Sequence, residues 1–146
     1  MIKEQYITFE TAKLAAQKGF DEAIPTFYMD IDGGGTYLNY ASETQIIDCP
    51  VNNTKLIELS KEDESVEYVS APTQSLLARW LREKHDINVN SYRTWAMDNS
   101  YNYEILVGTD FDGMVRQYSE PGRSFEKSME EGLQKALNLL EKEETK

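Results

Sequence analysis

Two residue types that build many catalytic and metal sites are almost absent from the chain. Cysteine occurs once, at Cys49, and histidine occurs once, at His85. A single cysteine excludes an internal disulfide and a cysteine zinc cluster, and a single histidine excludes a site built from several histidines. The two also lack the context of a nucleophile and its base, because Cys49 precedes a proline and His85 ends a predicted helix. We interpret both as structural residues.

Long apolar runs are absent as well. No stretch approaches the roughly 18 apolar residues that a membrane-spanning helix needs, and the first six residues contain no apolar signal segment. Together with the lack of cysteine pairs, this predicts a cytoplasmic protein with no membrane partner.

Cations are scarce relative to anions. The chain carries 26 Asp and Glu against 15 Lys and Arg, a net charge of −11. Phosphate backbones bind proteins through Lys and Arg that displace counterions, so this balance predicts that duplex nucleic acid is not a partner.

The 146 residues include 5 Phe, 2 Trp and 9 Tyr, enough to anchor one core. We predict a single α+β domain over residues 1–146, with a charged, frayed tail at residues 140–146.

Three segments carry helical signals. Residues 8–18 begin with a capping threonine, Thr8, and end before Gly19, a residue type that favours the left-handed conformation after a helix. Residues 72–85 and 124–142 have apolar residues at helical spacing, which predicts one buried face in each. The apolar face of the second segment comprises Leu76, Leu77, Trp80 and Leu81. We therefore expect Trp80 to anchor the core.

Strand signals fall between these helices. Two predicted hairpins join residues 26–31 to 36–40 and residues 87–97 to 101–108, and a third strand at 114–118 extends the second hairpin. Shorter strands are predicted at residues 45–48, 55–59 and 66–69. Because hairpins join the strands and strands do not alternate regularly with helices, we predict an α+β fold. Its sheet is mainly antiparallel, with three helices packed against one face.

The turn of the first hairpin resembles part of a calcium loop. Counting from Asp30, the first, third and sixth positions fit an EF-hand, but Gly34 and Ala41 stand where ligands are needed. The flanking segments read as strands, whereas both a calcium loop and a phosphate loop require helices. We interpret the segment as a hairpin turn and predict neither a metal nor a cofactor.

One local cluster of cations stands out. Arg79, Arg82 and Lys84 precede Arg93, and aromatic residues follow on the predicted hairpin. The cluster has two interpretations, a solvated helix face beside one paired strand arginine, or a surface that binds a ligand or partner. That candidate surface comprises Arg79, Arg82, Tyr92, Arg93, Trp95, Tyr101 and Tyr103. No residue is assigned a catalytic role, because no nucleophile stands near a base and an orienting group.

Three segments, Thr8–Phe20, Ala71–Ile87 and Phe125–Leu137, resemble a family of small uncharacterised bacterial proteins often encoded by phages and prophages. The resemblance covers about a third of the chain, and its most specific part is APTQSLLARWLREKHDI in the second segment. Residues 24–69 depart from the family pattern. The resemblance implies a mobile-element setting and assigns no functional residue, because the family has no established activity.

Two functional hypotheses follow. The first is a non-enzymatic binding or regulatory protein of phage or prophage origin that acts on a protein partner. The alternative is a small-molecule or nucleotide-binding protein, or an enzyme, that uses the Arg93 face of the aromatic hairpin. An elongated acidic surface favours the first hypothesis, and a deep pocket that joins Arg93 to the aromatic residues favours the second.

Overall fold

The computed structural model describes residues 3–43, 50–93, 100–108, 114–117 and 124–140. These residues divide into two compact units. We call Tyr6–Pro72 the N-terminal unit, and residues 3–5 with 73–140 the C-terminal unit. The single domain expected over residues 1–146 stays a prediction. The described residues contain no helix long and apolar enough to span a membrane.

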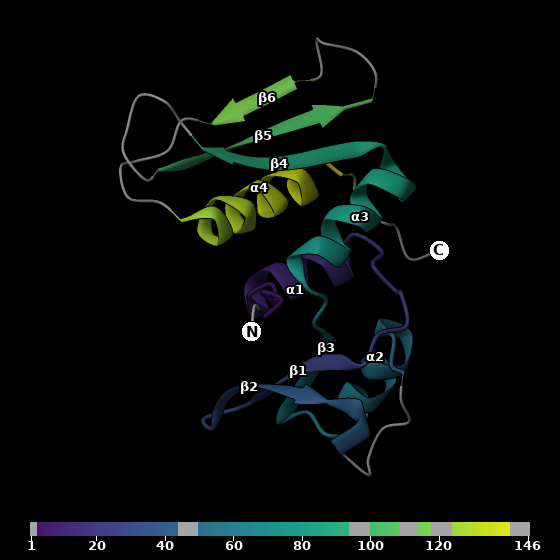
Figure 1. The fold of residues 1–146 in the computed structure, drawn as a ribbon. Coiled ribbons are helices and arrows are strands. Elements are labelled where there is room, and N and C mark those ends of the chain that lie inside the picture. The colour runs from purple at the N-terminus through teal and green to yellow at the C-terminus, as the bar shows by residue number, and fades with distance from the viewer. Residues whose placement is uncertain (1–2, 44–49, 94–99, 109–113, 118–123, 141–146) are drawn as a thin grey trace. The chain divides into compact units, whose positions relative to one another are not determined.

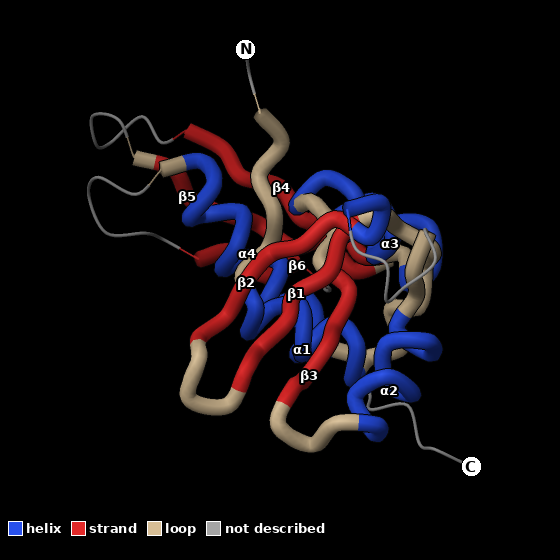
Figure 2. Tube along the Cα trace, turned by 90° about the horizontal axis from the view of Figure 1, so that it is seen from below, coloured by secondary structure: helices blue, strands red, loops and turns tan. Residues whose placement is uncertain are grey.

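The N-terminal unit is built on a three-stranded antiparallel sheet in the order β2-β1-β3 (Figures 1 and 2). The predicted hairpin is confirmed, and β1 is the central strand. The elements are α1 (Phe9–Gln17), β1 (Thr26–Ile31), β2 (Gly35–Tyr40), a short 3₁₀ turn (Ala41–Glu43), α2 (Asn53–Glu62) and β3 (Val66–Ser70).

Helix α1 begins and ends as its sequence predicts. The Thr8 side chain accepts a hydrogen bond from the Thr11 N–H, which caps the first turn. Gly19 follows the helix with a φ of +98°. The Phe20 N–H then donates to the Ala15 carbonyl at 3.0 Å. This is the hydrogen bond of a Schellman motif, which ends a helix at a residue in the left-handed conformation.

The two helices of this unit cover opposite faces of the sheet. Residues alternate between faces along a strand, so Phe27 and Tyr28 of β1 point in opposite directions. Phe27 packs with Leu56 of α2 in the buried core. The Tyr28 ring lies 5.9 Å from the ring of Phe9 in α1. The prediction of a single sheet with three helices on one face is therefore wrong for this part of the chain.

A buried amide joins α1, α2 and β3. The Asn53 side chain donates to the Phe20 carbonyl at 2.6 Å and accepts from the Ser70 N–H at 2.9 Å. Asn53 is the first residue of α2, Phe20 lies just after α1, and Ser70 ends β3. One side chain thus satisfies two buried backbone groups that belong to segments far apart in sequence.

Helix α2 replaces the strand that was expected at residues 55–59. The Asn52 side chain accepts from the Lys55 N–H at 3.0 Å and caps this helix. A second cap comes from far along the chain, because the Asp21 carboxylate accepts from both the N–H and the hydroxyl of Thr54. These caps and the packing of Leu56 outweigh the weak β propensity of the segment. The strand expected at residues 45–48 lies outside the described residues.

Replacing Asn53 with alanine is expected to lower the free energy of unfolding by about 2–4 kcal/mol, because two buried backbone groups lose their partners. The matched control is Asn52→Ala, which removes a cap and is expected to cost about 1 kcal/mol. Urea denaturation of both variants measures the difference. An Asn53→Ala variant that costs no more than Asn52→Ala would contradict the bridging role.

The C-terminal unit contains a second three-stranded antiparallel sheet, in the order β4-β5-β6. The predicted meander is confirmed, but the described residues form two small sheets rather than one and contain four helices rather than three. The elements are α3 (Gln74–His85), β4 (Ile87–Arg93), β5 (Tyr101–Val107), β6 (Met114–Gln117) and α4 (Phe125–Leu139).

Helix α3 follows its predicted pattern with one shift at its start. Thr73 caps the helix, so Pro72 precedes the cap instead of occupying the first turn. Trp80 is 7% exposed, which confirms that it belongs to the core. Asp86 ends the helix in the left-handed conformation with a φ of +53°. The sequence pattern did not predict this conformation.

Helix α4 lies across β4 and β5 at very close range (Figure 1). A Cβ atom added at Gly132 would stand 2.8 Å from Val89 Cγ1 and 3.1 Å from Tyr103 Cβ. The lack of a side chain at Gly132 therefore lets the helix backbone approach the sheet closely. Phe125, the first residue of α4, is 44% exposed and packs edge-on against Tyr101.

Gly132→Ala is expected to destabilise the protein by about 1 kcal/mol, because overpacking costs of about 1–3 kcal/mol exceed the gain of about 1 kcal/mol in helix propensity. Asn138→Ala, at an exposed position of α4, is the control and is expected to change stability by less than about 0.5 kcal/mol.

The steric cause is tested in the Val89→Ala background, which removes the closest atom. There Gly132→Ala should cost less, as a double-mutant cycle by urea denaturation measures. Equal costs in both backgrounds would show that Val89 does not oppose the added methyl group.

Candidate functional site

The cations of α3 form an exposed helix face. Arg79 and Arg82 are both exposed. The Arg79 Nε lies 3.0 Å from a carboxylate oxygen of Glu83 one turn later, with both side chains largely in solvent. A surface ion pair of this kind contributes little to stability. Its arrangement matches the interpretation of a solvated helix face.

The hairpin residues of the candidate surface divide between two faces of the sheet. Directly paired residues share a face, so Arg93 lies beside Tyr101, and Tyr103 lies beside Ser91 on that same face. Tyr103 is only 5% exposed, because α4 covers it. Tyr92 lies on the opposite face. Trp95 is outside the described residues, as is Cys49.

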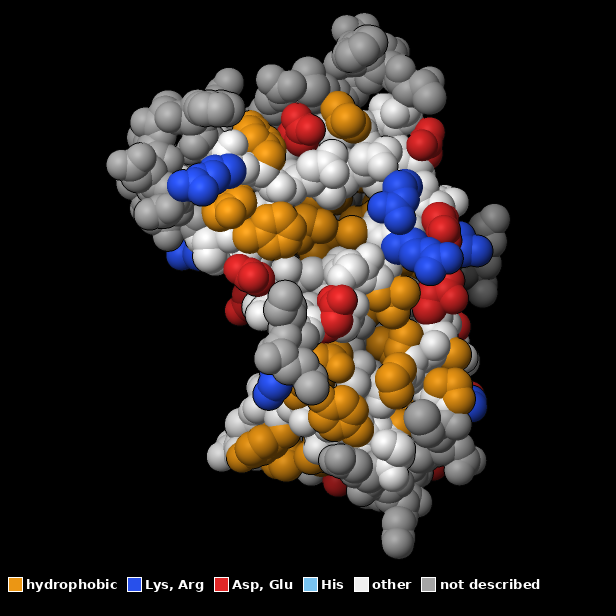
Figure 3. All heavy atoms as spheres, viewed as in Figure 1, with side chains coloured by type: hydrophobic (Ala, Val, Ile, Leu, Met, Phe, Trp, Pro, Cys, Tyr) orange, Lys and Arg blue, Asp and Glu red, His pale blue; other side chains and the backbone are white. Residues whose placement is uncertain are grey.

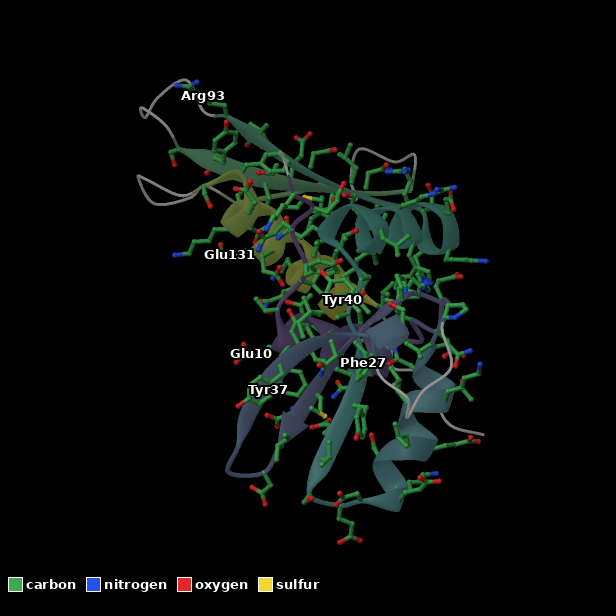
Figure 4. All side chains as sticks on the ribbon, turned by 60° about the horizontal axis from the view of Figure 1, so that its bottom comes forward. Glu10, Phe27, Tyr37, Tyr40, Arg93 and Glu131 are labelled. Carbon is green, nitrogen blue, oxygen red and sulfur yellow. The ribbon has the colours of Figure 1, made fainter. Side chains whose placement is uncertain are left out.

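Arg93 is also remote from the α3 cations along β4. Arg82 lies in the last turn of α3, next to the start of β4 at Ile87. Arg93 is the last residue of that strand, and Figure 4 shows it at the strand end away from α3. Six strand steps of about 3.3 Å separate Ile87 from Arg93 by about 20 Å. The structure therefore brings together Arg93 and Tyr101, and separates them from Arg79 and Arg82.

A recess of about 310 Å³ lies in the C-terminal unit at the first turns of α3 and α4. The amide of Gln74, one of its lining residues, donates to the Glu126 carbonyl at 2.9 Å and to the Glu130 carboxylate at 3.1 Å. The recess is lined by Lys3, Glu4, Gln5, Gln74, Ser75, Phe125, Glu126 and Met129. Arg93 is not among the lining residues, so this recess is not the pocket that the alternative hypothesis requires.

Strand β2 forms an open edge of the N-terminal sheet. It pairs with β1 on one side, and the described residues place no strand on its other side. Its sequence, GTYLNY, contains neither a charged residue nor a proline. Tyr37 is 52% exposed and Tyr40 is 41% exposed. In Figure 3, hydrophobic side chains gather on the surface of the region that contains β1 and β2.

The hydrogen bonds show which backbone groups of β2 face outward. The Ala41 N–H donates to the Pro25 carbonyl at 2.8 Å, so odd-numbered residues at this end of the hairpin bond to β1. Antiparallel pairs alternate between bonded and non-bonded positions. The backbone N–H and C=O groups of Thr36, Leu38 and Tyr40 therefore point away from β1.

The turn holds the Tyr37 side chain in a fixed position. The Tyr37 hydroxyl donates to the Gly34 carbonyl at 2.7 Å. Gly35 has a φ of +95°, and a Cβ atom there would stand 3.6 Å from the Tyr37 hydroxyl oxygen. Figure 4 shows Tyr37 at the margin of the sheet, whereas Phe27 lies within the unit.

A row of apolar side chains continues from Tyr37 across the sheet. Tyr37, Met29 and Tyr68 are paired in register and share one face. The Asp63 carboxylate accepts hydrogen bonds from the hydroxyl and N–H of Ser65, which lower the pKa of Asp63. Burial, and secondly the charge of Asp63, raises the pKa of Tyr68. The far end of the row is therefore a neutral phenol beside a carboxylate.

Negative charge is concentrated in the N-terminal unit. Residues 6–72 carry twelve acids and four bases, which gives −8 of the total charge of −11. Residues 19–54 contain six acids and no Lys or Arg. Strands β1 and β2 both fall within this stretch. Strand β2 is thus an uncharged, aromatic strand within a stretch of chain that contains no Lys or Arg.

No protein-family model, curated protein or solved structure matches the chain. Among the described residues, no three His, Cys, Asp or Glu side chains gather in a group that would hold a metal ion. The hairpin turn that resembled a calcium loop uses Asp30 to accept a hydrogen bond from the Thr36 hydroxyl at 2.7 Å.

Sequence reasoning located β2 as a hairpin strand but did not single out its edge. Two signals for it were present in the sequence. One is a strand with two tyrosines and no charge, and the other is the absence of Lys and Arg from residues 19–54. The deciding fact, that β1 lies in the middle and β2 outside, depends on where β3 pairs.

Raising the pH above about 10, the ordinary pKa of tyrosine, is expected to remove a stabilising contribution of Tyr68. The folded state keeps this phenol protonated to higher pH than the unfolded chain does. Its contribution is therefore complete below the unfolded pKa and is lost as the pH rises through the folded pKa.

Urea denaturation of the wild type and Tyr68→Phe at several pH values from about 8 to 11 measures this effect. The stability difference between them should shift in favour of the phenylalanine variant as the pH rises. A constant difference would contradict it. Asp63→Asn, which removes the lesser cause, should lower the pKa of Tyr68 without abolishing the effect.

Proposed function

We propose that this chain is a non-enzymatic binding or regulatory protein whose partner is another protein, contacted through the β2 edge. The observation that carries the proposal is an uncharged edge strand, Gly35–Tyr40, with two exposed tyrosines. Edge strands invite pairing with other chains, and proteins commonly protect them with lysine, proline or a bulge. The first two of these are absent from β2.

Tyrosine is the residue type that suits such an interface. It supplies a large apolar area and a polar tip at low conformational cost, and it is enriched among residues that dominate binding energy. Tyr37 is already positioned by its hydrogen bond to Gly34, so little ordering remains to oppose association. Tyr40, at the other end of the strand, extends the same edge.

Phage or prophage origin is part of this proposal and rests on the resemblance of three sequence segments. In the structure these segments contain α1, α3 and the greater part of α4. Strand β2 lies in residues 24–69, the region that departs from the family pattern. That division suits a shared scaffold with a binding edge adapted to a particular partner.

Site-specific photocrosslinking in the host cell tests the proposal. A benzophenone amino acid at position 37 is expected to give a discrete adduct with one protein, identified by mass spectrometry. The matched control carries the same group in place of Ile57, which is 49% exposed on α2. No adduct at position 37, or the same adducts at both positions, would contradict the proposal.

The captured protein is then purified and its affinity measured by calorimetry. Tyr37→Ala with Tyr40→Ala is expected to weaken binding by about tenfold or more, as residues that dominate an interface do. Ile57→Ala should change the affinity by less than about twofold. Equal affinities for the wild type and the double variant would place the contact elsewhere on the chain.

A further inference from the structure

We infer that the β2 edge takes up an extended, Lys- and Arg-rich segment of the partner as a fourth strand of the N-terminal sheet. This inference rests on the proposed function and names the chemistry of the segment that binds. Three features of β2 lead to it, namely its outward backbone groups, the placement of its two tyrosines and the charge around it.

The backbone groups require an extended segment. Thr36, Leu38 and Tyr40 direct their N–H and C=O groups outward. They span four strand steps, or about 13 Å, which matches about five residues of an added strand. Such strand addition supplies affinity through main-chain hydrogen bonds, while side chains provide the selectivity. A helix does not satisfy these groups in register, because its own backbone groups are bonded within the helix.

The tyrosines flank the added strand on both faces. Tyr37 pairs with Met29 and shares the face that α2 covers. Tyr40 pairs with Thr26 and lies on the opposite face, the one that carries Tyr28. Alternate side chains of a bound strand also point to opposite faces. Each face of the bound segment therefore has one phenol ring within reach.

The charge distribution selects cationic side chains for these positions. No Lys or Arg occurs in residues 19–54, and the hairpin bears Asp30 and Asp32 next to its turn. Lys and Arg are attracted both to an aromatic face and to a negative surrounding. An acidic segment meets repulsion from the −8 of residues 6–72. The same repulsion disfavours a second copy of this chain on the edge.

Binding of a labelled peptide to the full-length protein tests the inference. The probe is a fluorescein-labelled TKVKRVKT peptide, which has cations on both faces when extended, measured by fluorescence anisotropy at about 150 mM salt. Two peptides are compared with it. TEVEEVET reverses the charge, and TKVKRVKT methylated at alternate backbone nitrogens cannot complete a ladder.

The wild-type protein is expected to bind the basic peptide at least tenfold more tightly than either comparison peptide. Tyr37→Ala with Tyr40→Ala should weaken binding by about tenfold, and Ile57→Ala should leave it within about twofold. Because the methylated peptide is tested on the unaltered protein, that arm does not depend on the folding of a variant.

Three results would overturn the inference. The first is that the basic peptide does not bind. The second is that the methylated peptide binds as tightly as the unmethylated one, which indicates charge attraction alone. The third is that the double tyrosine variant binds the basic peptide as tightly as the wild type does. If crosslinking at position 37 still captures a protein in these cases, the proposed function stands and only the strand chemistry fails. If crosslinking fails as well, both fail. Dimers in light scattering that Tyr37→Ala dissolves would instead assign the edge to a second copy.

Discussion

The buried amide of Asn53 is the interaction on which the N-terminal unit depends. Its side chain satisfies the Phe20 carbonyl and the Ser70 N–H, so it links the segment after α1 to the end of β3. A buried backbone group without a partner costs about 1–3 kcal/mol, which makes this position far less tolerant than its exposed neighbours. Through the same two bonds, Asn53 holds the end of β3 beside the start of α2.

The placement of β1 in the middle of the sheet determines what the surface offers. The even-numbered residues Thr26 and Asp32 bond toward β3, as Thr26 does to the Ala71 N–H at 3.0 Å. Odd-numbered residues of β1 bond toward β2, which leaves the even-numbered residues of β2 facing outward. An uncharged strand at such an edge is a liability unless it binds a partner, because its open backbone groups can pair with the wrong chain. Under the proposed function, the negative charge of the N-terminal unit makes that edge selective, since it repels acidic chains and attracts basic ones.

The C-terminal unit was the more predictable part of the chain. Local signals defined α3, α4 and the β4–β5 hairpin, because the helical spacing of apolar residues and the paired strand signals agreed. The close approach at Gly132 was not predictable, since a glycine within a helical pattern carries no signal of what lies opposite it. The register of β4 and β5 placed Arg93 and Tyr101 on one face. Only the docking of α4 showed that Tyr103 is buried there while Arg93 stays exposed.

By itself the sequence determined the α+β class, the hairpin pairings, the cap of α1 and the excess of negative charge, because each depends on residues close together in the chain. The tertiary structure decided that residues 53–62 are a helix, since a cap from Asp21 and the burial of Leu56 outweigh local propensity. It also decided that there are two sheets, that the expected basic surface is divided, and that β2 is an edge. Those outcomes depend on which strands and helices pack together although they are far apart in sequence. Local sequence patterns do not encode that packing.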